Sequence, residues 1–165
     1  MVIRKSAGSD FDAILAIIND AADAYRGVIP VDRWHDPYMP ADELEAEVAA
    51  GVVFWVAEQD GRLSAVMGIQ DKGDVALVRH AYVASTTQRT GVGTSLLRHV
   101  EALADKPILI GTWGAATWAI RFYERNGYTL VSSDDKNRLL RTYWSIPDRQ
   151  IETSVVLASR RWIEV

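Results

Sequence analysis

The sequence predicts an α/β (α+β) fold, in which a mixed, mostly antiparallel central sheet is flanked by helices on both faces. Three strand-like runs follow one another over residues 52–83 and are separated by turn residues, which is typical of an antiparallel meander. Further along the chain, strand-like runs alternate with amphipathic helices, which is typical of a sheet covered by helices. No linker-like stretch interrupts residues 1–165, so we expect a single domain.

The chain is expected to begin with a strand and a helix. Val2–Ser6 fit a short edge strand. From about Asp10 to Tyr25 the apolar residues recur at helical spacing, which predicts one amphipathic helix. Ser9 is the expected N-cap of this helix, because a Ser hydroxyl can accept a hydrogen bond from a backbone N–H of the first turn.

Residues 26–40 contain three prolines and a glycine, so they form the first irregular stretch. A short helix over Ala41–Ala50 follows and is stopped by Gly51. The meander strands are expected at Val52–Glu58, Leu63–Gln70 and Val75–Val83, with turns at 59–62 and 71–74. The later elements are expected to be helix Gly91–Ala104, strand Pro107–Thr112, helix Ala115–Asn126 ended by Gly127, strand Tyr128–Ser132, helix Asn137–Ser145 ended by Pro147, and strand Glu152–Ala158.

The composition excludes several classes of protein. Lys and Arg number 18 against 22 Asp and Glu, so the net charge is −4, whereas a domain that grips nucleic acid usually has a basic excess. The lack of cysteine excludes disulfides, thiolate zinc sites and a cysteine nucleophile, and it fits a reducing cytoplasm. The N-terminus carries no apolar signal-peptide core, and the longest apolar run, Ala49–Ala57, is too short to span a bilayer. We therefore expect a cytoplasmic protein with no nucleic-acid or membrane partner.

The most informative stretch is a polar loop between a strand and a helix, with the spacing Gln88-x-x-Gly91-x-Gly93. The start of a helix leaves backbone N–H groups unpaired and carries a partial positive charge. Glycine lets a phosphate approach that backbone closely, and Arg89 can add a full charge. The loop is neither a Walker loop, which would end in Gly-Lys-Ser/Thr, nor a dinucleotide fingerprint, which needs a third glycine. The residues therefore indicate a site for an anion such as a pyrophosphate.

The spacing resembles the Q/R-x-x-G-x-G/A motif of the GNAT superfamily, the acyl-CoA-dependent N-acyltransferases. A second stretch, Ala119 to Tyr128, resembles the family's Ala-x-x-Phe-Tyr-x-x-x-Gly-Phe/Tyr run, and it includes Phe122, Tyr123 and Gly127. The expected element order also agrees with that of the family over roughly residues 1–158. The resemblance implies a GNAT-like fold and an enzyme that moves an acetyl group from acetyl-CoA to a primary amine. The amine would attack the thioester directly in a ternary complex.

The resemblance also implies a place for acetyl-CoA, the co-substrate, and it implies no metal. The pantetheine arm would pair with backbone groups of Ala81, Tyr82 and Val83. The pyrophosphate would lie on the amides of Gln88, Arg89, Thr90, Gly91, Val92, Gly93 and Thr94. Tyr123 would protonate the departing thiolate, since a phenol and a thiol are of similar basicity. The sequence departs from the family at Ala116, where many relatives carry an Asn that touches the cofactor.

The acceptor site and the general base are less well defined. The residues that the resemblance places near the acceptor are Tyr25, Trp34, His35, Tyr38, Arg79 and His80. Leu77 and Arg79 share one face of their strand. The resemblance aligns these two residues with the positions that carry the base in some relatives, and neither can accept a proton. His80 would point to the other face unless a bulge redirects it. Glu58 and water are the remaining alternatives.

Two functions stay open at this point. The first is the acetyltransferase, which acts on a small-molecule or peptide amine. The second is a non-catalytic acyl-CoA-binding module of the same fold, which serves as a sensor or as a partner-binding subunit. Tyr123 favours the enzyme, whereas the lack of an obvious base favours the module. A toxin that acetylates aminoacyl-tRNA is disfavoured by the net charge of −4. A homodimer is compatible with either function.

Overall fold

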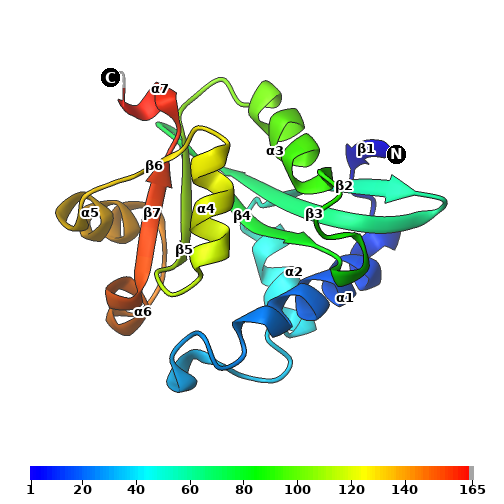
Figure 1. Cartoon of the computed structure of the whole chain (residues 1–165), viewed down its shortest axis with the longest axis horizontal. Helices are drawn as coiled ribbons and strands as arrows, with labels where there is room; N and C mark the ends of the chain where they lie inside the picture. The colour runs from blue at the N-terminus through cyan, green and yellow to red at the C-terminus, as the bar shows by residue number, and fades with distance from the viewer. Residues whose placement is uncertain (164–165) are drawn as a thin grey trace. The chain divides into compact units, whose positions relative to one another are not determined.

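The computed structural model describes residues 1–163, which form two compact units (Figure 1). The first unit contains Met1–Ala24, His35–Asp71 and Val78–Asp105. The second contains Tyr25–Trp34, Lys72–Leu77 and the residues from Lys106 onward. The described residues include seven strands together with helices, and the strand pairs described below are antiparallel. The predicted α/β class with a mostly antiparallel sheet is thus confirmed.

The first unit is built on the predicted meander. Its strands are β1 (Val2–Lys5), β2 (Val53–Gln59), β3 (Arg62–Asp71) and the part of β4 (Ala76–Val83) from Val78 onward, and they lie in that order. Strands β1 and β2 pair antiparallel, as do β2 and β3. The tight turn between β2 and β3 holds Asp60 and Gly61 at φ 53° and 75°. Two consecutive left-handed residues match the right-handed twist of a hairpin, which explains why this turn was predictable.

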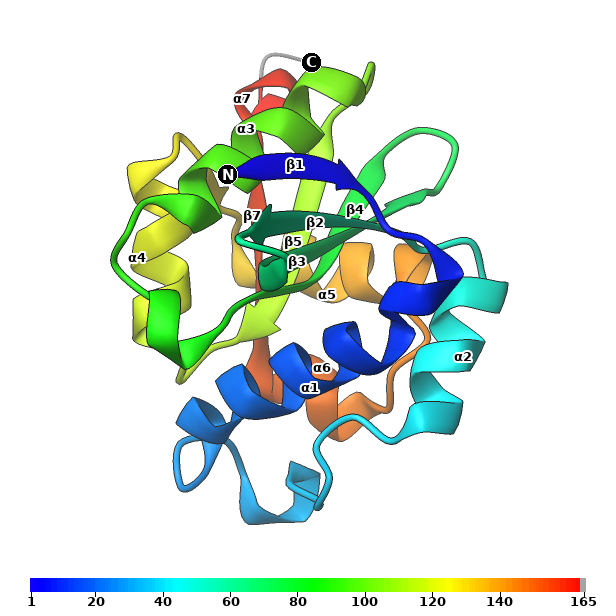
Figure 2. The same ribbon diagram turned by 90° about the vertical axis from the view of Figure 1, so that its right-hand side faces the viewer.

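Helices cover both faces of the first unit's sheet (Figure 2). Helix α1 (Phe11–Ala22) and helix α2 (Ala41–Ala49) lie on one face, and helix α3 (Val92–Leu103) lies on the other. Short 3₁₀ turns at Gly8–Asp10 and Asp23–Tyr25 flank α1. The core between α1, α2 and the sheet consists of Ile14, Ile17, Ile18, Met39, Leu44, Val52, Phe54, Val56 and Val66.

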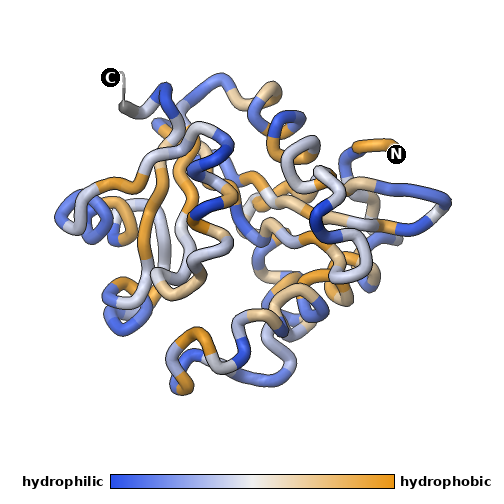
Figure 3. The backbone as a smooth tube through the Cα atoms, viewed as in Figure 1, coloured by the Kyte–Doolittle hydropathy of each residue, from blue (hydrophilic) through white to orange (hydrophobic). Residues whose placement is uncertain are grey.

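The second unit has its own sheet, in which β5 (Ile108–Trp113), β7 (Ser154–Ala158) and β6 (Thr129–Leu130) lie in that order and pair antiparallel. Its helices are α4 (Thr117–Arg125), α5 (Ser133–Tyr143), α6 (Asp148–Thr153) and α7 (Arg160–Ile163), and a 3₁₀ turn covers Val31–Arg33. Apolar residues run along β5 and β7 (Figure 3). The core of this unit consists of Val75, Leu77, Leu109, Leu139, Leu140, Ile151, Val156 and Ala158.

Most predicted elements are confirmed, with ends that lie within one or two residues of the expected ones. Gly51 and Gly127 end α2 and α4 with φ values of 97° and 91°, a conformation that glycine adopts without strain. Other boundaries were wrong. The helix expected at 137–145 begins at Ser133, where the Ser132 hydroxyl caps it by accepting the N–H of Asp135. Helices α6 and α7 were not predicted, and the strand expected at 128–132 covers only Thr129–Leu130.

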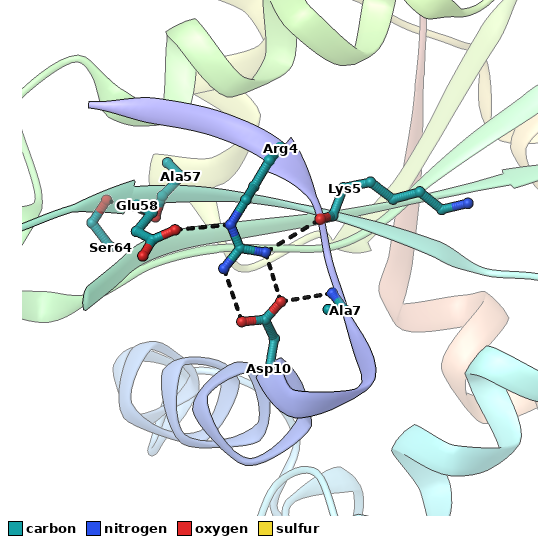
Figure 4. A network of polar contacts seen from close by, with 7 residues as sticks. All are labelled: Arg4, Lys5, Ala7, Asp10, Ala57, Glu58 and Ser64. Atoms are coloured by element: carbon teal, nitrogen blue, oxygen red, sulfur yellow. Dashed lines mark hydrogen bonds and ion pairs between the residues drawn. The ribbon is translucent and has the colours of Figure 1, made fainter. Parts of the chain in front are cut away.

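The predicted N-cap at Ser9 is also wrong, because an ion pair organises this corner (Figure 4). Ser9 lies inside the 3₁₀ turn that precedes α1. The carboxylate of Asp10 accepts the backbone N–H of Ala7 at 2.7 Å and is held by the guanidinium of Arg4. Arg4 also donates to the carboxylate of Glu58 on β2 at 2.8 Å. Glu58 therefore belongs to the contact that joins β1, β2 and the start of α1. The sequence had offered Glu58 as one alternative for the general base.

No helix among the described residues is both long enough and apolar enough to cross a membrane.

Candidate functional site

The predicted anion loop lies between β4 and α3 in the first unit. Gly91 is the N-cap of α3 and has φ 83°, and no heavy atom lies within 4 Å of the place where a Cβ would stand. The first N–H groups of an α-helix have no partner within the helix. The loop therefore leads into a helix start, and at Gly91 its backbone is open on the side where a Cβ would stand.

Two contacts with the rest of the first unit hold this loop in place. The Thr87 hydroxyl donates to the backbone carbonyl of Ser64 at 3.1 Å, and the N–H of Ala84 donates to the same carbonyl at 2.9 Å. Asp20 of α1 accepts hydrogen bonds from the N–H and the hydroxyl of Ser85, at 2.8 and 3.0 Å. The role of Asp20 was missed, because its partner lies 65 residues away in sequence.

The residues expected to hold the pyrophosphate differ in exposure. Gln88, Arg89, Thr90 and Gly91 are exposed and follow one another at the surface, and Thr94 is exposed as well. Arg89 has φ 66°, a left-handed conformation. Gly93 is half-buried, and the Val92 side chain is buried, so Val92 can offer only its backbone to a ligand. Ala81, Tyr82 and Val83, at the end of β4, are half-buried.

The middle of β4 departs from regular strand geometry at His80, whose φ is 53°. A left-handed residue that is not glycine costs about 1–3 kcal/mol, and such residues cluster at functional sites. Strict alternation would place Arg79 and His80 on opposite faces. Instead both side chains reach Glu47 of α2: His80 Nε2 lies 3.0 Å from its Oε2, and Arg79 Nη1 lies 3.3 Å from the same oxygen. His80 was expected on the other face unless an irregularity in the strand redirects it, and its left-handed backbone is such an irregularity.

Gly68 of β3 makes this irregular strand possible. A Cβ on Gly68 would lie 2.7 Å from Val52 Cγ1 and 2.8 Å from the carbonyl oxygen of Arg79. Contacts that short do not occur for real Cβ atoms, so only glycine fits between the backbone of β4 and the side chain of Val52. Neither Gly68 nor Glu47 was identified from the sequence, because their partners are far away along the chain.

In the second unit, Tyr123 of α4 lies in an aromatic cluster. Its side chain is buried, with only 6% exposed. The rings of Phe122 and Tyr128 lie 5.1 and 5.9 Å from its ring, both edge-on. Burial, with a smaller contribution from the nearby phenol of Tyr25, raises the pKa of Tyr123 above its usual range. The phenol therefore stays protonated at ordinary pH, as a proton donor must.

The residues expected near the acceptor are distributed over both units. Tyr25 stacks on Trp118, with ring centroids 5.6 Å apart, and belongs to the second unit with Tyr123. Trp34 is in the same unit and carries the guanidinium of Arg26 over its ring, 4.6 Å from the centroid. His35 and Tyr38 belong to the first unit.

In the first unit, the rings of His35 and Tyr38 stack with their centroids 6.2 Å apart. The Nδ1 atom of His35 lies 2.9 Å from the carbonyl oxygen of Pro37, so this histidine is engaged within its own loop. Among residues 1–163, no group of three or more His, Cys, Asp or Glu side chains is arranged to hold a metal ion.

Comparison with known proteins agrees with this geometry. Residues 50–130 match the family model described as an acetyltransferase (GNAT) domain. This stretch contains β2 to α4, and so includes the loop at 84–94, the pair formed by Arg79 and His80, and Tyr123. Among curated proteins, none is similar enough in sequence to count as a match.

Solved structures share the fold over nearly the whole chain. A GNAT-family acetyltransferase from Staphylococcus aureus superposes with a TM-score of 0.72 at 15% identity, covering 96% of this chain and 97% of the other. The PaiA N-acetyltransferase from Thermoplasma acidophilum, solved in complex with coenzyme A, gives 0.73 at 14% identity, with 96% and 97% covered. A ribosomal-protein-alanine N-acetyltransferase from Brucella melitensis gives 0.62 at 22% identity, with 80% and 86% covered. The family model therefore identifies residues 50–130 as similar to a GNAT acetyltransferase domain, and the solved structures show that the chain has the GNAT fold.

Proposed function

We propose that the protein is an N-acetyltransferase that moves an acetyl group from acetyl-CoA to a primary amine by direct attack in a ternary complex. The observation that carries the proposal is the start of α3. There Gly91 has φ 83°, and no heavy atom lies within 4 Å of its Cβ position. A backbone so arranged at a helix N-terminus suits a phosphate group. We also propose that residues 1–165 act as one domain, because both units carry motif residues.

The first unit would bind the co-substrate. In this proposal the amides of residues 88–94 hold the pyrophosphate, and Arg89 supplies a positive charge from the exposed surface. The pantetheine arm pairs with the backbone of Ala81, Tyr82 and Val83. Residues of the loop are already held by Asp20 and Ser64, so little conformational freedom is lost when the phosphate binds.

The second unit would supply the acid. When the amine nitrogen attacks the thioester carbon, the C–S bond breaks and the sulfur leaves as a thiolate. The phenol of Tyr123, which is protonated at ordinary pH, donates its proton to that sulfur as charge develops on it. Tyr25, whose phenol lies near enough to Tyr123 to raise its pKa further, is proposed to contact the acceptor.

The acceptor is proposed to be a small-molecule or peptide amine. The Brucella melitensis structure is that of a ribosomal-protein-alanine N-acetyltransferase, which supports an amino group on a peptide as one option. The proposed location is the cytoplasm, where acetyl-CoA and such amines occur together. No nucleic-acid partner is proposed, since the net charge is −4.

A second candidate function is a non-catalytic acyl-CoA-binding module. The observation that favours it is the burial of Tyr123 among the rings of Phe122 and Tyr128. A core tyrosine would show the same burial without any role in catalysis. Such a module would bind acetyl-CoA and would not consume it.

Thiol release in the presence of amines separates the two functions. The full chain is incubated with acetyl-CoA and a panel of amino acids, polyamines, aminoglycosides and peptides, and free CoA thiol is measured together with the mass of each amine. The enzyme predicts thiol release that depends on one class of amine and equals the acetylated product. Binding of acetyl-CoA in a calorimeter without thiol release for any amine would favour the module. Absence of binding would contradict both functions.

A further inference from the structure

We propose that His80 is the general base of this reaction and that Glu47 is its positioning residue. The inference rests on the proposed function and adds a residue that accepts the proton of the amine, together with a partner that no sequence motif indicated. An amine that arrives as an ammonium ion has no lone pair with which to attack a thioester, so a proton must leave it first.

The contact with Glu47 fixes the orientation of the His80 imidazole ring. His80 Nε2 lies 3.0 Å from Glu47 Oε2, which is within hydrogen-bond distance. An ionised carboxylate can only accept, so the hydrogen of the neutral ring is on Nε2 and the lone pair is on Nδ1. The two side chains are 16% and 18% exposed, respectively, so the pair is sheltered while the imidazole can still be reached.

The neighbouring residues hold Glu47 in that orientation. Arg79 Nη1 lies 3.3 Å from Glu47 Oε2 and donates to Gln70 Oε1 at 3.1 Å. The Gln70 side chain in turn donates to the carbonyl of Ala50, just after α2, at 2.9 Å. This chain of contacts joins β3, β4 and the C-terminal end of α2, so the carboxylate that faces His80 has little freedom to turn away.

The backbone of β4 is arranged to bring His80 to this partner. With φ 53°, His80 interrupts the alternation of the strand, and its ring turns toward Glu47 and the ring of Phe54, whose centroid is 6.1 Å away. The next residue is Ala81, the first of the three whose backbone is proposed to hold the pantetheine arm. The proposed base therefore immediately precedes, in β4, the three residues that are proposed to bind the pantetheine arm.

All protons of the acetyl transfer are accounted for without any further reactant. His80 Nδ1 takes one proton from the ammonium and later releases it to solvent. The neutral amine forms the C–N bond, and the C–S bond breaks. Tyr123 gives its proton to the sulfur, and the second proton lost by the nitrogen restores the phenol through water. The products are the amide, free CoA thiol and one proton in solution.

The experiment compares two acceptors that differ only in whether the amine needs a base. One is an alkyl amine that is an ammonium ion at the assay pH, and the other is a hydrazide or alkoxyamine of similar shape that is already neutral. His80→Asn keeps a residue that tolerates the left-handed conformation and removes the imidazole. We expect kcat with the ammonium acceptor to fall by about 10²–10⁴-fold and kcat with the neutral acceptor to change little. Added imidazole should partly restore the lost rate.

Glu47→Gln provides a second readout should the first variant fold poorly, and it should show the same selective loss to a smaller extent. Arg98→Gln, which breaks an exposed pair with Glu101 on α3, is the control and should change neither rate. The inference would be overturned if kcat fell equally with both acceptors in both variants, or if kcat fell in neither variant. Thiol release by the wild type would still support the proposed function in that case. No thiol release by the wild type would overturn both.

Discussion

The guanidinium of Arg4 donates two hydrogen bonds to the carboxylate of Asp10, at 2.8 and 3.0 Å, and so joins the edge strand β1 to the start of α1 (Figure 4). These bonds, together with the N–H of Ala7, lower the pKa of Asp10 from 3.8 to about 2. Desolvation acts in the opposite direction and is outweighed. The corner therefore depends on an ionised carboxylate.

This contact predicts a loss of stability in acid. The folded-state pKa of Asp10 is depressed, so its contribution is present above pH 3.8 and is lost as the pH falls toward about 2. Asp10→Asn should lower the urea midpoint at pH 7, and the difference from the wild type should shrink between pH 4 and pH 2. Asp135→Asn, which removes an exposed pair with Arg138, is the control and should have a smaller effect at pH 7. A difference that stays constant over this pH range would contradict the assignment.

A pair of glycines tests the phosphate loop. Gly91 and Gly73 have φ 83° and 84°, and for both no heavy atom lies within 4 Å of a would-be Cβ. Gly91→Val and Gly73→Val should therefore carry similar backbone strain and lower the melting temperature alike. Only Gly91→Val should weaken CoA binding in calorimetry, by about tenfold or more, because its side chain occupies the place of the phosphate. Equal CoA affinity in the two variants would mean that the phosphate binds elsewhere.

The close approach of β3 and β4 predicts a different kind of loss. Gly68→Ala brings a methyl group to 2.8 Å from the carbonyl of Arg79, and neither that backbone nor Val52 can yield freely. Overpacking of this kind costs about 1–3 kcal/mol, which should appear as a lower urea midpoint at unchanged slope. Gly8→Ala is the matched control, because nothing lies within 4 Å of its Cβ position, and it should be neutral. Equal stability of the two variants would contradict the packing described here.

The features that the sequence predicted well are those set by neighbouring residues. Gly51 and Gly127 mark the C-terminal ends of helices because a left-handed residue is a local requirement that glycine meets. The turn at Asp60 and Gly61 was predictable for the same reason. The anion loop and the expected position of Tyr123 come from motifs that are themselves short stretches of chain.

The features that sequence reasoning missed are set by residues far apart in the chain. Serine is a preferred N-cap residue, yet Asp10 and not Ser9 is the residue that precedes α1. The carboxylate of Asp10 accepts the N–H of Ala7 and is held by Arg4, which comes from β1. Glu47 pairs with His80 across 33 residues, and no motif marks Glu47. Strand β7 lies between β5 and β6, which hydropathy alone does not reveal, because that order depends on which strand edges remain free to pair.

The most direct test of the account is the turnover of Tyr123→Phe with the amine that the acceptor screen identifies. The substitution removes one hydroxyl and keeps a buried ring in contact with Phe122 and Tyr128. Tyr128→Phe is the matched control, since it deletes a hydroxyl from the adjacent buried ring. We predict that kcat of Tyr123→Phe falls by about 10²–10⁴-fold, with an unchanged dissociation constant for acetyl-CoA, whereas Tyr128→Phe keeps its turnover. Full turnover by Tyr123→Phe would contradict the account, since the thiolate would then take its proton from another donor.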